Sequence, residues 1–493
     1  MNWLKKLFWY CLLIEGFIIV NGSKKFPGTF KIGVGTSAYQ VEGGWNADGK
    51  GESWWDYALN TQCNTADCGN GNVAGDNYHK YKEDIAIMKD LNAGFYRFSI
   101  SWSRILPTGF ANETNQAGID YYLDLLKTLK ENNIDAAVTL YHWDLPQNLA
   151  QYGGWLNEQT AEWFGEYARV AFELFGDYVK YWLTINEPHV FCLGGYGSYH
   201  GMGFMCPGET DENATKIYQC SKVALLAHAT AYHIYDTEFR AKQGGKVTLV
   251  TDSSWYEPIS NDTKDLEAWD RELQFQLGWF AHPVYLGNWP QVMIERIAER
   301  SKGEGFAQSR LPELSQEEID FINGTFDFFA LNTYSSTLIG WADDSPISQP
   351  SYDLDTNVYA TSDPSWTFAE VGYVVSWPLG IRKLVKWIND QYNPGEIFIT
   401  ENGWTSGDYL NDTDRITYQT SYLENVLDAV LIDNVPVTHY TVWSLIDTFE
   451  WGSGYTVKFG MVQIDFESDN KTRTYKDSAN WFKKVATERC VGC

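Results

Sequence analysis

Short apolar runs alternate along the chain with longer stretches in which apolar residues recur every three or four positions. The short runs are rich in β-branched and aromatic residues, which favour strands, and the longer stretches have the periodicity of helices. This alternation predicts parallel βαβ units, because a helix must return the chain between parallel strands. Eight strands are predicted, at residues 30–39, 93–102, 135–141, 181–186, 246–251, 326–332, 396–401 and 437–443.

The number of strands predicts how the sheet closes. Helical patterns fall between the strands, for example at residues 78–91, 119–132 and 158–175. Eight parallel strands with helices between them predict an α/β fold of the (β/α)8 TIM barrel type. At 493 residues the chain is long for such a barrel, so we expect extended βα loops on a single domain.

The first 22 residues have the pattern of a signal peptide. Lys5 and Lys6 precede an apolar run at residues 7–20, which is too short to span a membrane comfortably. We therefore divide the chain into a signal peptide at residues 1–22 and one barrel domain at residues 23–493. No other long apolar segment follows, so we expect a secreted or extracellular protein without a membrane anchor. The sequence does not distinguish the extracellular space from a gut lumen or a lysosome-like compartment.

The net charge and the glycosylation sequons indicate which partners and modifications to expect. The chain has 64 acidic and 37 basic residues, a formal charge of −27, which disfavours nucleic acid as a partner. Six Asn-X-Thr sequons predict surface glycans, at Asn112, Asn213, Asn261, Asn323, Asn411 and Asn470.

Seven of the eight cysteines lie beyond the predicted signal peptide. An odd number leaves one thiol unpaired. Proximity in the sequence favours Cys63 with Cys68 and Cys206 with Cys220, which would leave Cys192 as a buried free thiol. No cysteine has the spacing of a metal ligand together with histidines, and we expect neither a metal nor a cofactor.

Polar side chains stand at the carboxyl ends of the predicted strands, where the active site of a barrel lies. A single carboxylate there is more often a cap or part of a salt bridge, but this set is chemically coherent. Glu187 and Glu401 would face one another across the mouth, and glycoside hydrolysis needs such a pair. Amides and indoles around them suit the hydroxyls and the apolar face of a sugar. These strand-end residues are Gln40, His142, Trp143, Asn186, Asn332, Tyr334 and Trp443.

Two motifs resemble the catalytic signatures of glycoside hydrolase family 1: LTINEP at residues 183–188 and ITENG at residues 399–403. Further matches are FKIGVGTSAYQVEG (30–43), YRFSISW (96–102), YHWDLP (141–146) and WSLIDTFEW (443–451). The resemblance covers about residues 26–482 and is greatest to the animal branch, which includes insect digestive and defensive β-glucosidases.

The resemblance assigns roles to matching positions. Glu187 looks like the acid/base and Glu401 like the nucleophile, with Arg97 beside it and Tyr334 donating a hydrogen bond to it. The positions that would bind substrate are Gln40, His142, Asn186, Asn332, Trp377, Trp443, Glu450 and Trp451. The loops at residues 194–207 and 335–366 are expected to line the aglycone side together with Trp377. Thr448 stands where asparagine is usual in the family, and it is expected to lie beside the site.

The resemblance implies a secreted retaining β-glycosidase that removes the terminal non-reducing β-D-glucosyl residue of a β-glucoside or oligosaccharide. The sequence does not decide whether galactosides or fucosides are also hydrolysed, nor which aglycone is bound. It also does not decide the oligomeric state, for which a homodimer is one alternative. The main alternative is a myrosinase-like thioglucosidase that cleaves glucosinolates. A non-catalytic sugar-binding relative is disfavoured, because both carboxylates are present.

Overall fold

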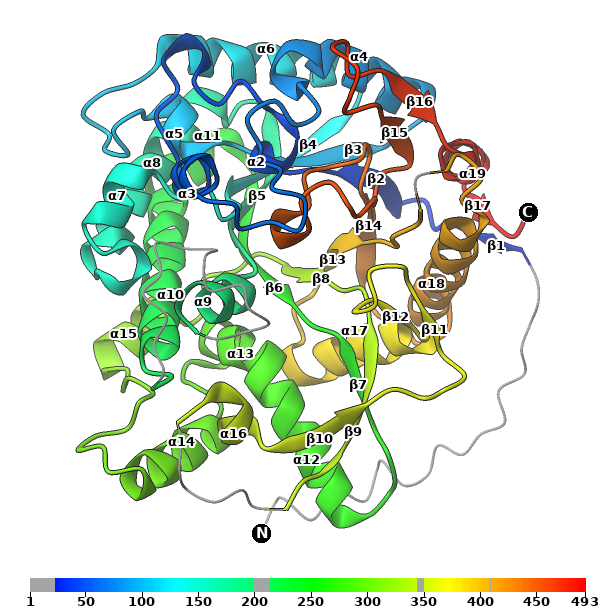
Figure 1. The fold of residues 1–493 in the computed structure, drawn as a ribbon. Helices are drawn as coiled ribbons and strands as arrows, with labels where there is room; N and C mark the ends of the chain where they lie inside the picture. The colour runs from blue at the N-terminus through cyan, green and yellow to red at the C-terminus, as the bar shows by residue number, and fades with distance from the viewer. Residues whose placement is uncertain (1–22, 198–212, 344–349, 408) are drawn as a thin grey trace.

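The eight predicted strands form a closed barrel in the computed structural model of the chain, which describes residues 23–197, 213–343, 350–407 and 409–493 (Figure 1). Around the barrel the strands follow the order β13-β14-β2-β3-β4-β5-β6-β8, and neighbouring strands are parallel. The predicted TIM barrel is therefore confirmed. Its strands are β2 (Lys31–Gly35), β3 (Phe95–Ser99), β4 (Asp135–Tyr141), β5 (Val179–Asn186), β6 (Lys246–Asp252), β8 (Phe329–Asn332), β13 (Ile397–Asn402) and β14 (Val437–Trp443).

Two of these strands end earlier than the apolar pattern predicts. β2 ends at Gly35, because residues 38–41 turn into the short helix α2 (Ala38–Val41). β3 ends at Ser99, and α5 (Trp102–Ile105) takes up the end of the predicted strand. Both short helices are buried, so periodicity of apolar residues could not separate them from the strands before them.

Helices cover the outside of the barrel, as Figure 1 shows. The three helices predicted from periodicity are present, within three residues of the expected bounds. Their apolar stripes face the strands, which are almost fully buried between the helices and the barrel interior. The long outer helices are α4 (Asn77–Asp90), α6 (Gln116–Glu131), α8 (Gln159–Phe175), α10 (Lys216–Ile234), α12 (Thr263–Leu273), α14 (Gln291–Gly303), α17 (Leu379–Tyr392), α18 (Thr413–Leu431) and α19 (Asp477–Glu488).

The barrel interior is filled with side chains and is not a pore. Phe95, Tyr181, Phe328 and Phe398 form a compact cluster with smaller apolar residues, and the Phe95 and Phe398 rings meet edge to face at 5.1 Å. These residues lie at or near the amino ends of their strands. The interior can therefore be reached only from the carboxyl ends.

A second, smaller sheet lies outside the barrel. It has the order β10-β9-β7 and is formed by β7 (Trp255–Pro258), β9 (Ser336–Trp341) and β10 (Val358–Thr361). The expectation that residues 335–366 form a loop is wrong, since they contain β9, α16 (Tyr352–Thr356) and β10. The pairing of β7 with β9 joins segments about 80 residues apart, which no local pattern reveals.

The disulfide predicted between Cys206 and Cys220 is wrong. Cys220 on α10 is bonded to Cys192 on α9 (Pro188–Tyr196), with their Cα atoms 5.7 Å apart. α9 packs against α10, and this tertiary contact overrides the shorter separation in the sequence. Cys63 and Cys68 are bonded as predicted, and Cys490 is bonded to Cys493. Cys206 lies outside the described residues.

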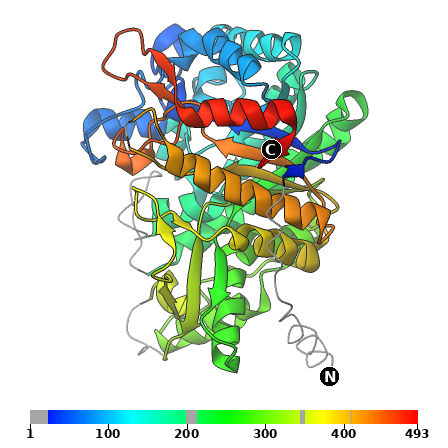
Figure 2. The same ribbon diagram turned by 90° about the vertical axis from the view of Figure 1, so that its right-hand side faces the viewer.

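The two ends of the described chain meet. β1 (Lys24–Lys25) pairs with β17 (Cys490–Val491) in an antiparallel ribbon, where the blue and red ends of the chain lie side by side (Figure 2). The predicted signal peptide, residues 1–22, lies outside the described residues. None of the helices in the described part of the chain combines the length and the apolar character needed to cross a membrane.

Candidate active site

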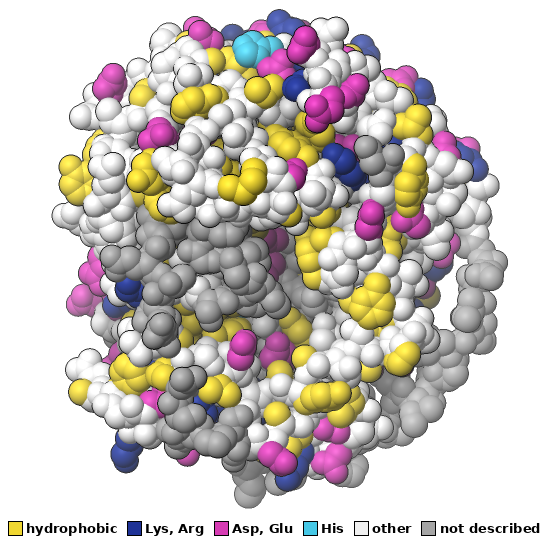
Figure 3. All heavy atoms as spheres, viewed as in Figure 1, with side chains coloured by type: hydrophobic (Ala, Val, Ile, Leu, Met, Phe, Trp, Pro, Cys, Tyr) yellow, Lys and Arg dark blue, Asp and Glu magenta, His cyan; other side chains and the backbone are white. Residues whose placement is uncertain are grey.

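The polar residues predicted at the strand ends are brought together at the carboxyl end of the barrel. Asn186 ends β5, Asn332 ends β8, Glu401 lies one residue before the end of β13 and Trp443 ends β14. Figure 3 shows one face of the molecule hollowed near its centre, with hydrophobic side chains along the rim of the hollow.

Glu187 stands at the junction of β5 and α9. Pro188 opens the helix, so the strand must end before it, and Glu187 takes a left-handed conformation with φ of 45°. Its backbone N–H donates to Val250 on β6 at 3.0 Å, which fixes the turn to the barrel. Its carboxyl group accepts a hydrogen bond from Asn332 Nδ2 at 2.7 Å. The side chain is only 8% exposed.

Glu401 is held from two sides. The Arg97 guanidinium donates to its Oε1 atom, and the Tyr334 hydroxyl donates to its Oε2 atom at 2.5 Å. Arg97 is fully buried inside the barrel and also donates to Asn186 Oδ1 at 2.5 Å. Both oxygens of the Glu401 carboxylate are therefore occupied by donors, as the prediction for Arg97 and Tyr334 required.

The two carboxyl groups have different electrostatic surroundings. Burial raises the pKa of Glu187, and the negative charges of Glu401 and Asp252 raise it further. Burial also raises the pKa of Glu401, but the Arg97 charge and the hydrogen bond from Tyr334 oppose that rise. When the two carboxyl groups share one proton, the proton therefore resides on Glu187, and Glu401 is ionised.

An amide network links the two carboxyl groups. Asn332 Nδ2 donates to Asn186 Oδ1 at 3.1 Å as well as to Glu187, and Asn186 contacts His142 Nε2 at 3.3 Å. Thr400 fixes the orientation of the Asn332 amide by donating to its Oδ1 atom at 2.6 Å. Sequence reasoning missed Thr400, although its position next to Glu401 in the ITENG motif was a signal.

A second cluster lies beside this pair, after β14. Gln40 Nε2 donates to Glu450 Oε2 at 3.1 Å, and Ser37 donates to the other end of the Gln40 amide at 2.6 Å. Thr448 also donates to Glu450 Oε2, at 3.1 Å, so this residue contacts the site and does not merely lie beside it. Burial raises the pKa of Glu450 to about 8. Near neutral pH its carboxyl group can therefore donate as well as accept hydrogen bonds.

Aromatic rings form one wall of the site. The His142 ring is nearly parallel to the rings of Trp443 and Trp451, at centroid distances of 5.9 and 6.0 Å. The Trp443 ring also lies beside the Arg97 guanidinium at 5.7 Å. The Trp443–Ser444 peptide bond is cis. Flat apolar faces of this kind suit the ring of a sugar.

Trp377 lies farther out, directly after the short strand β12 (Val375–Ser376) that pairs with β11 (Thr367–Phe368). It stacks on Trp366 at 5.2 Å, and the Lys383 ammonium lies 5.0 Å from its ring. Tyr373, in the same hairpin, is 61% exposed and within electrostatic range of Glu450 and Glu187. This hairpin therefore stands at the rim of the site.

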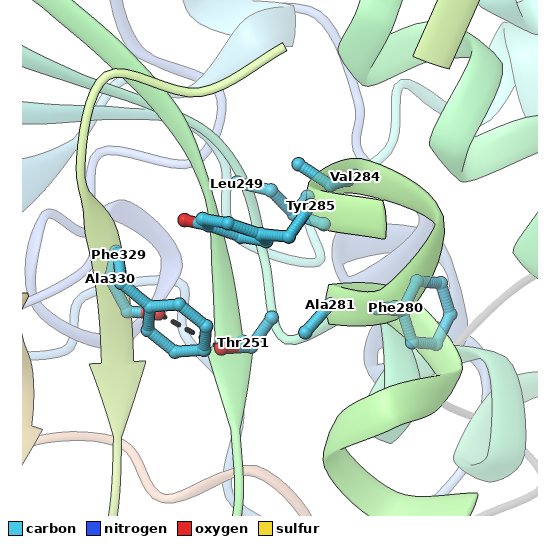
Figure 4. A pocket seen from close by; sticks show the side chains of 8 residues that line it. All are labelled: Leu249, Thr251, Phe280, Ala281, Val284, Tyr285, Phe329 and Ala330. Carbon is cyan, nitrogen blue, oxygen red and sulfur yellow. Dashed lines mark hydrogen bonds between the residues drawn. The ribbon is translucent and has the colours of Figure 1, made fainter. Parts of the chain in front are cut away.

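A void also lies behind the barrel wall, between β6, β8 and α13 (Trp279–Leu286) (Figure 4). It is lined mainly by apolar side chains, and Thr251, its polar neighbour on β6, donates to the Ala330 carbonyl at 3.0 Å. The void has no room for a water molecule. It is a packing defect and not a ligand site.

Comparison with known proteins finds similarity along nearly the whole chain. The glycosyl hydrolase family 1 model matches residues 22–490. Myrosinase 1 from Brevicoryne brassicae is 42% identical over 466 residues, covering 94% of this chain and 98% of that protein. A solved aphid myrosinase aligns with a TM-score of 0.88 and 42% identity over 94% of this chain and 99% of its own. A mutant rice β-glucosidase, solved in a covalent complex with Glc, aligns with a TM-score of 0.87 and 36% identity over 94% and 99%.

Proposed function

The chain belongs to glycosyl hydrolase family 1 and is a β-glycosidase, and from this premise we propose that Glu401 is its nucleophile and Glu187 its acid/base. The observation that carries the proposal is the contrast between the two carboxyl groups. Glu401 accepts hydrogen bonds from Arg97 and Tyr334 on both oxygens, which favours the ionised form. Glu187 has a neutral amide, Asn332, as its partner and retains the proton.

In the first step, Glu401 attacks the anomeric carbon while Glu187 transfers its proton to the glycosidic oxygen. The bond to the aglycone breaks, the aglycone leaves as a neutral alcohol, and the sugar is bound to Glu401 as an ester. Glu187 is then ionised and able to act as a base. In the second step it takes a proton from water, whose oxygen attacks the anomeric carbon and releases Glu401.

The remaining residues bind and orient the sugar in this proposal. Asn186 lies between Arg97 and His142, where it can contact the 2-hydroxyl, an interaction that strengthens in the transition state. Gln40 and Glu450 form a polar clamp for the distal hydroxyls, and Trp443 supplies the stacking face. A carboxyl group in the clamp suits an unphosphorylated sugar, and β-D-glucosides are the proposed substrates.

We predict that the β-anomer of glucose forms first, since two displacements at one carbon retain its configuration. Proton NMR of a fresh reaction with a β-glucoside distinguishes the anomers before they equilibrate in water. Early accumulation of the α-anomer would contradict the role of Glu401 as a nucleophile. It would leave Glu401 as a base that activates water.

We also propose that residues 1–22 are removed as a signal peptide and that a single catalytic domain, residues 23–493, is secreted. The asparagines of all six sequons are exposed on the surface, as glycan attachment requires. Three disulfides are present among the described residues, which fits an oxidising compartment.

Protein recovered from the medium of a secretory host is expected to begin near Ser23 and to lose mass on deglycosylation. Alkylation before reduction should label one peptide, that containing Cys206, because the other six cysteines beyond residue 22 are bonded in pairs. Peptide mass spectrometry measures all three properties. Labelling of Cys192 or Cys220 in folded protein would contradict the pairing between α9 and α10.

A further inference from the structure

We propose that Asp252 is a positioning residue for the acid/base: its carboxylate, held by His189, keeps the proton on Glu187 until the glycosidic oxygen takes it. This inference rests on the proposed role of Glu187. Neither Asp252 nor His189 takes part in the two chemical steps described above. Both are near the acid/base, because His189 follows Glu187 by two residues and Asp252 ends β6, the neighbour of β5.

The strand register places Asp252 beside Glu187. Asp252 is the last residue of β6 and is aligned with Asn332 on β8, whose amide donates to Glu187 at 2.7 Å. Val250, two residues earlier, accepts the Glu187 backbone N–H and belongs to the interior cluster of the barrel. Residues two apart on a strand point to the same face, so the Asp252 carboxylate also points toward the barrel interior.

His189 fixes this carboxylate. It lies in the first turn of α9, two residues after Glu187, and is only 3% exposed. Its Nδ1 atom lies 3.2 Å from Asp252 Oδ2, and its Nε2 atom lies 3.4 Å from the Tyr352 hydroxyl. Tyr352 donates its own proton to the Phe275 carbonyl at 3.0 Å. The Asp252 carboxylate can only accept, so Nδ1 of the neutral His189 ring carries the proton, and packing of the Tyr352 hydroxyl against the other side of the ring keeps Nδ1 turned toward Asp252.

The negative charge of the Asp252 carboxylate is only partly compensated by its surroundings. Its Oδ1 atom is buried and has no hydrogen-bond partner within the described ranges. A negative charge in this position makes ionisation of Glu187 less favourable, as the raised pKa of Glu187 reflects after burial and the charge of Glu401. The positive charge of Arg97, on β3, has the opposite effect and lowers the pKa of Glu187.

The other charged groups near the pair lie around His189. Glu272 on α12 is buried, and its burial raises its pKa to about 7, while His189 and Arg271 lower it and Asp353 raises it. Glu272 therefore interacts with His189, the residue that holds Asp252. The Asp252 carboxylate is thus the group of this cluster that bears directly on the acid/base.

The test is the dependence of kcat/KM on pH with cellobiose, whose leaving group needs its proton. The alkaline limb reports ionisation of the acid in the free enzyme. Asp252→Asn removes the negative charge and should move this limb to lower pH by about half a unit or more. With 2,4-dinitrophenyl β-glucoside, whose leaving group needs no proton, kcat/KM should stay within about threefold of wild type.

Two further variants separate charge from structure. His189→Gln keeps a donor for Asp252 and leaves its charge, so the alkaline limb should stay at the wild-type pH or above it, and this test stands even if Asp252→Asn does not fold. Asp135→Asn is the matched control, because Asp135 is a partly exposed acid at the amino end of β4. Its profile should match that of wild type.

An active Asp252→Asn enzyme whose alkaline limb does not move would overturn the proposal, as would a His189→Gln limb at lower pH. An equal loss of kcat/KM with both substrates and no shift of the limb would show a purely structural role and overturn it too. These results differ from failure of the proposed function, in which wild type would hydrolyse no β-glucoside.

Discussion

Replacing Glu401 by glutamine is expected to lower kcat/KM by on the order of 10⁵-fold for every β-glucoside, whatever its leaving group. The amide cannot attack the anomeric carbon, and it also loses the ion pair with Arg97. Because attack by Glu401 is required with any aglycone, an activated leaving group should not rescue the variant. Initial rates with cellobiose and with 2,4-dinitrophenyl β-glucoside measure the effect.

Glu396→Gln is the matched control for this experiment. Glu396 directly precedes β13, at the opposite end of the strand from the site, and pairs with Lys246. Its replacement should leave kcat/KM within a few-fold of wild type. Should folded Glu401→Gln retain more than about a hundredth of the wild-type rate with either substrate, Glu401 could not be the nucleophile.

Replacing Glu187 by glutamine should have an effect that depends on the leaving group. The variant keeps the shape of the side chain but cannot donate a proton. Formation of the glycosyl-enzyme should slow by roughly 10² to 10⁴-fold with a disaccharide or an alkyl glucoside, and much less with a nitrophenyl glucoside. Hydrolysis of the intermediate should also slow, because no base remains, and added azide should partly restore turnover.

The same variant separates an O-glucosidase from a thioglucosidase. The leaving group of a glucosinolate departs readily without a proton, so the acid matters little for it. The raised pKa of Glu187 supplies a proton that an O-glucoside needs and a glucosinolate does not, so we expect O-glucosides to be the preferred substrates. A wild type that turned over a glucosinolate far faster than any O-glucoside, with glycosyl-enzyme formation scarcely slowed in Glu187→Gln, would contradict this preference but not the fold or the nucleophile.

The sequence predicted the barrel well because each strand is buried on both sides. Asp135–Tyr141 and Val437–Trp443 are rich in β-branched, aromatic and small apolar residues, and their predicted bounds agree with the structure. The carboxyl ends of such strands must meet at one end of a closed barrel. The positions of Glu187 and Glu401 on facing sides of the mouth therefore followed from the topology.

What the sequence did not predict depends on contacts between distant segments. The pairing of β7 with β9 and the bond between Cys192 and Cys220 both arise from packing outside the barrel. Hydrogen-bond partners such as Thr400 and Thr448 carry no distinctive pattern of their own. Only their placement beside Asn332 or Glu450 gives them a role.

The grouping of Glu187, Glu401 and Glu450 around one hollow also affects the stability of the fold. Burial raises the pKa of all three carboxyl groups. An unfolded glutamate ionises near pH 4.3, at about its ordinary pKa, whereas the folded chain still holds the protons of Glu187 and Glu450 at higher pH. The free energy of unfolding therefore falls as the pH rises from about 4 toward the value of about 8 for Glu450. The arrangement that serves catalysis near neutral pH therefore contributes less to the stability of the fold there than in mildly acidic solution.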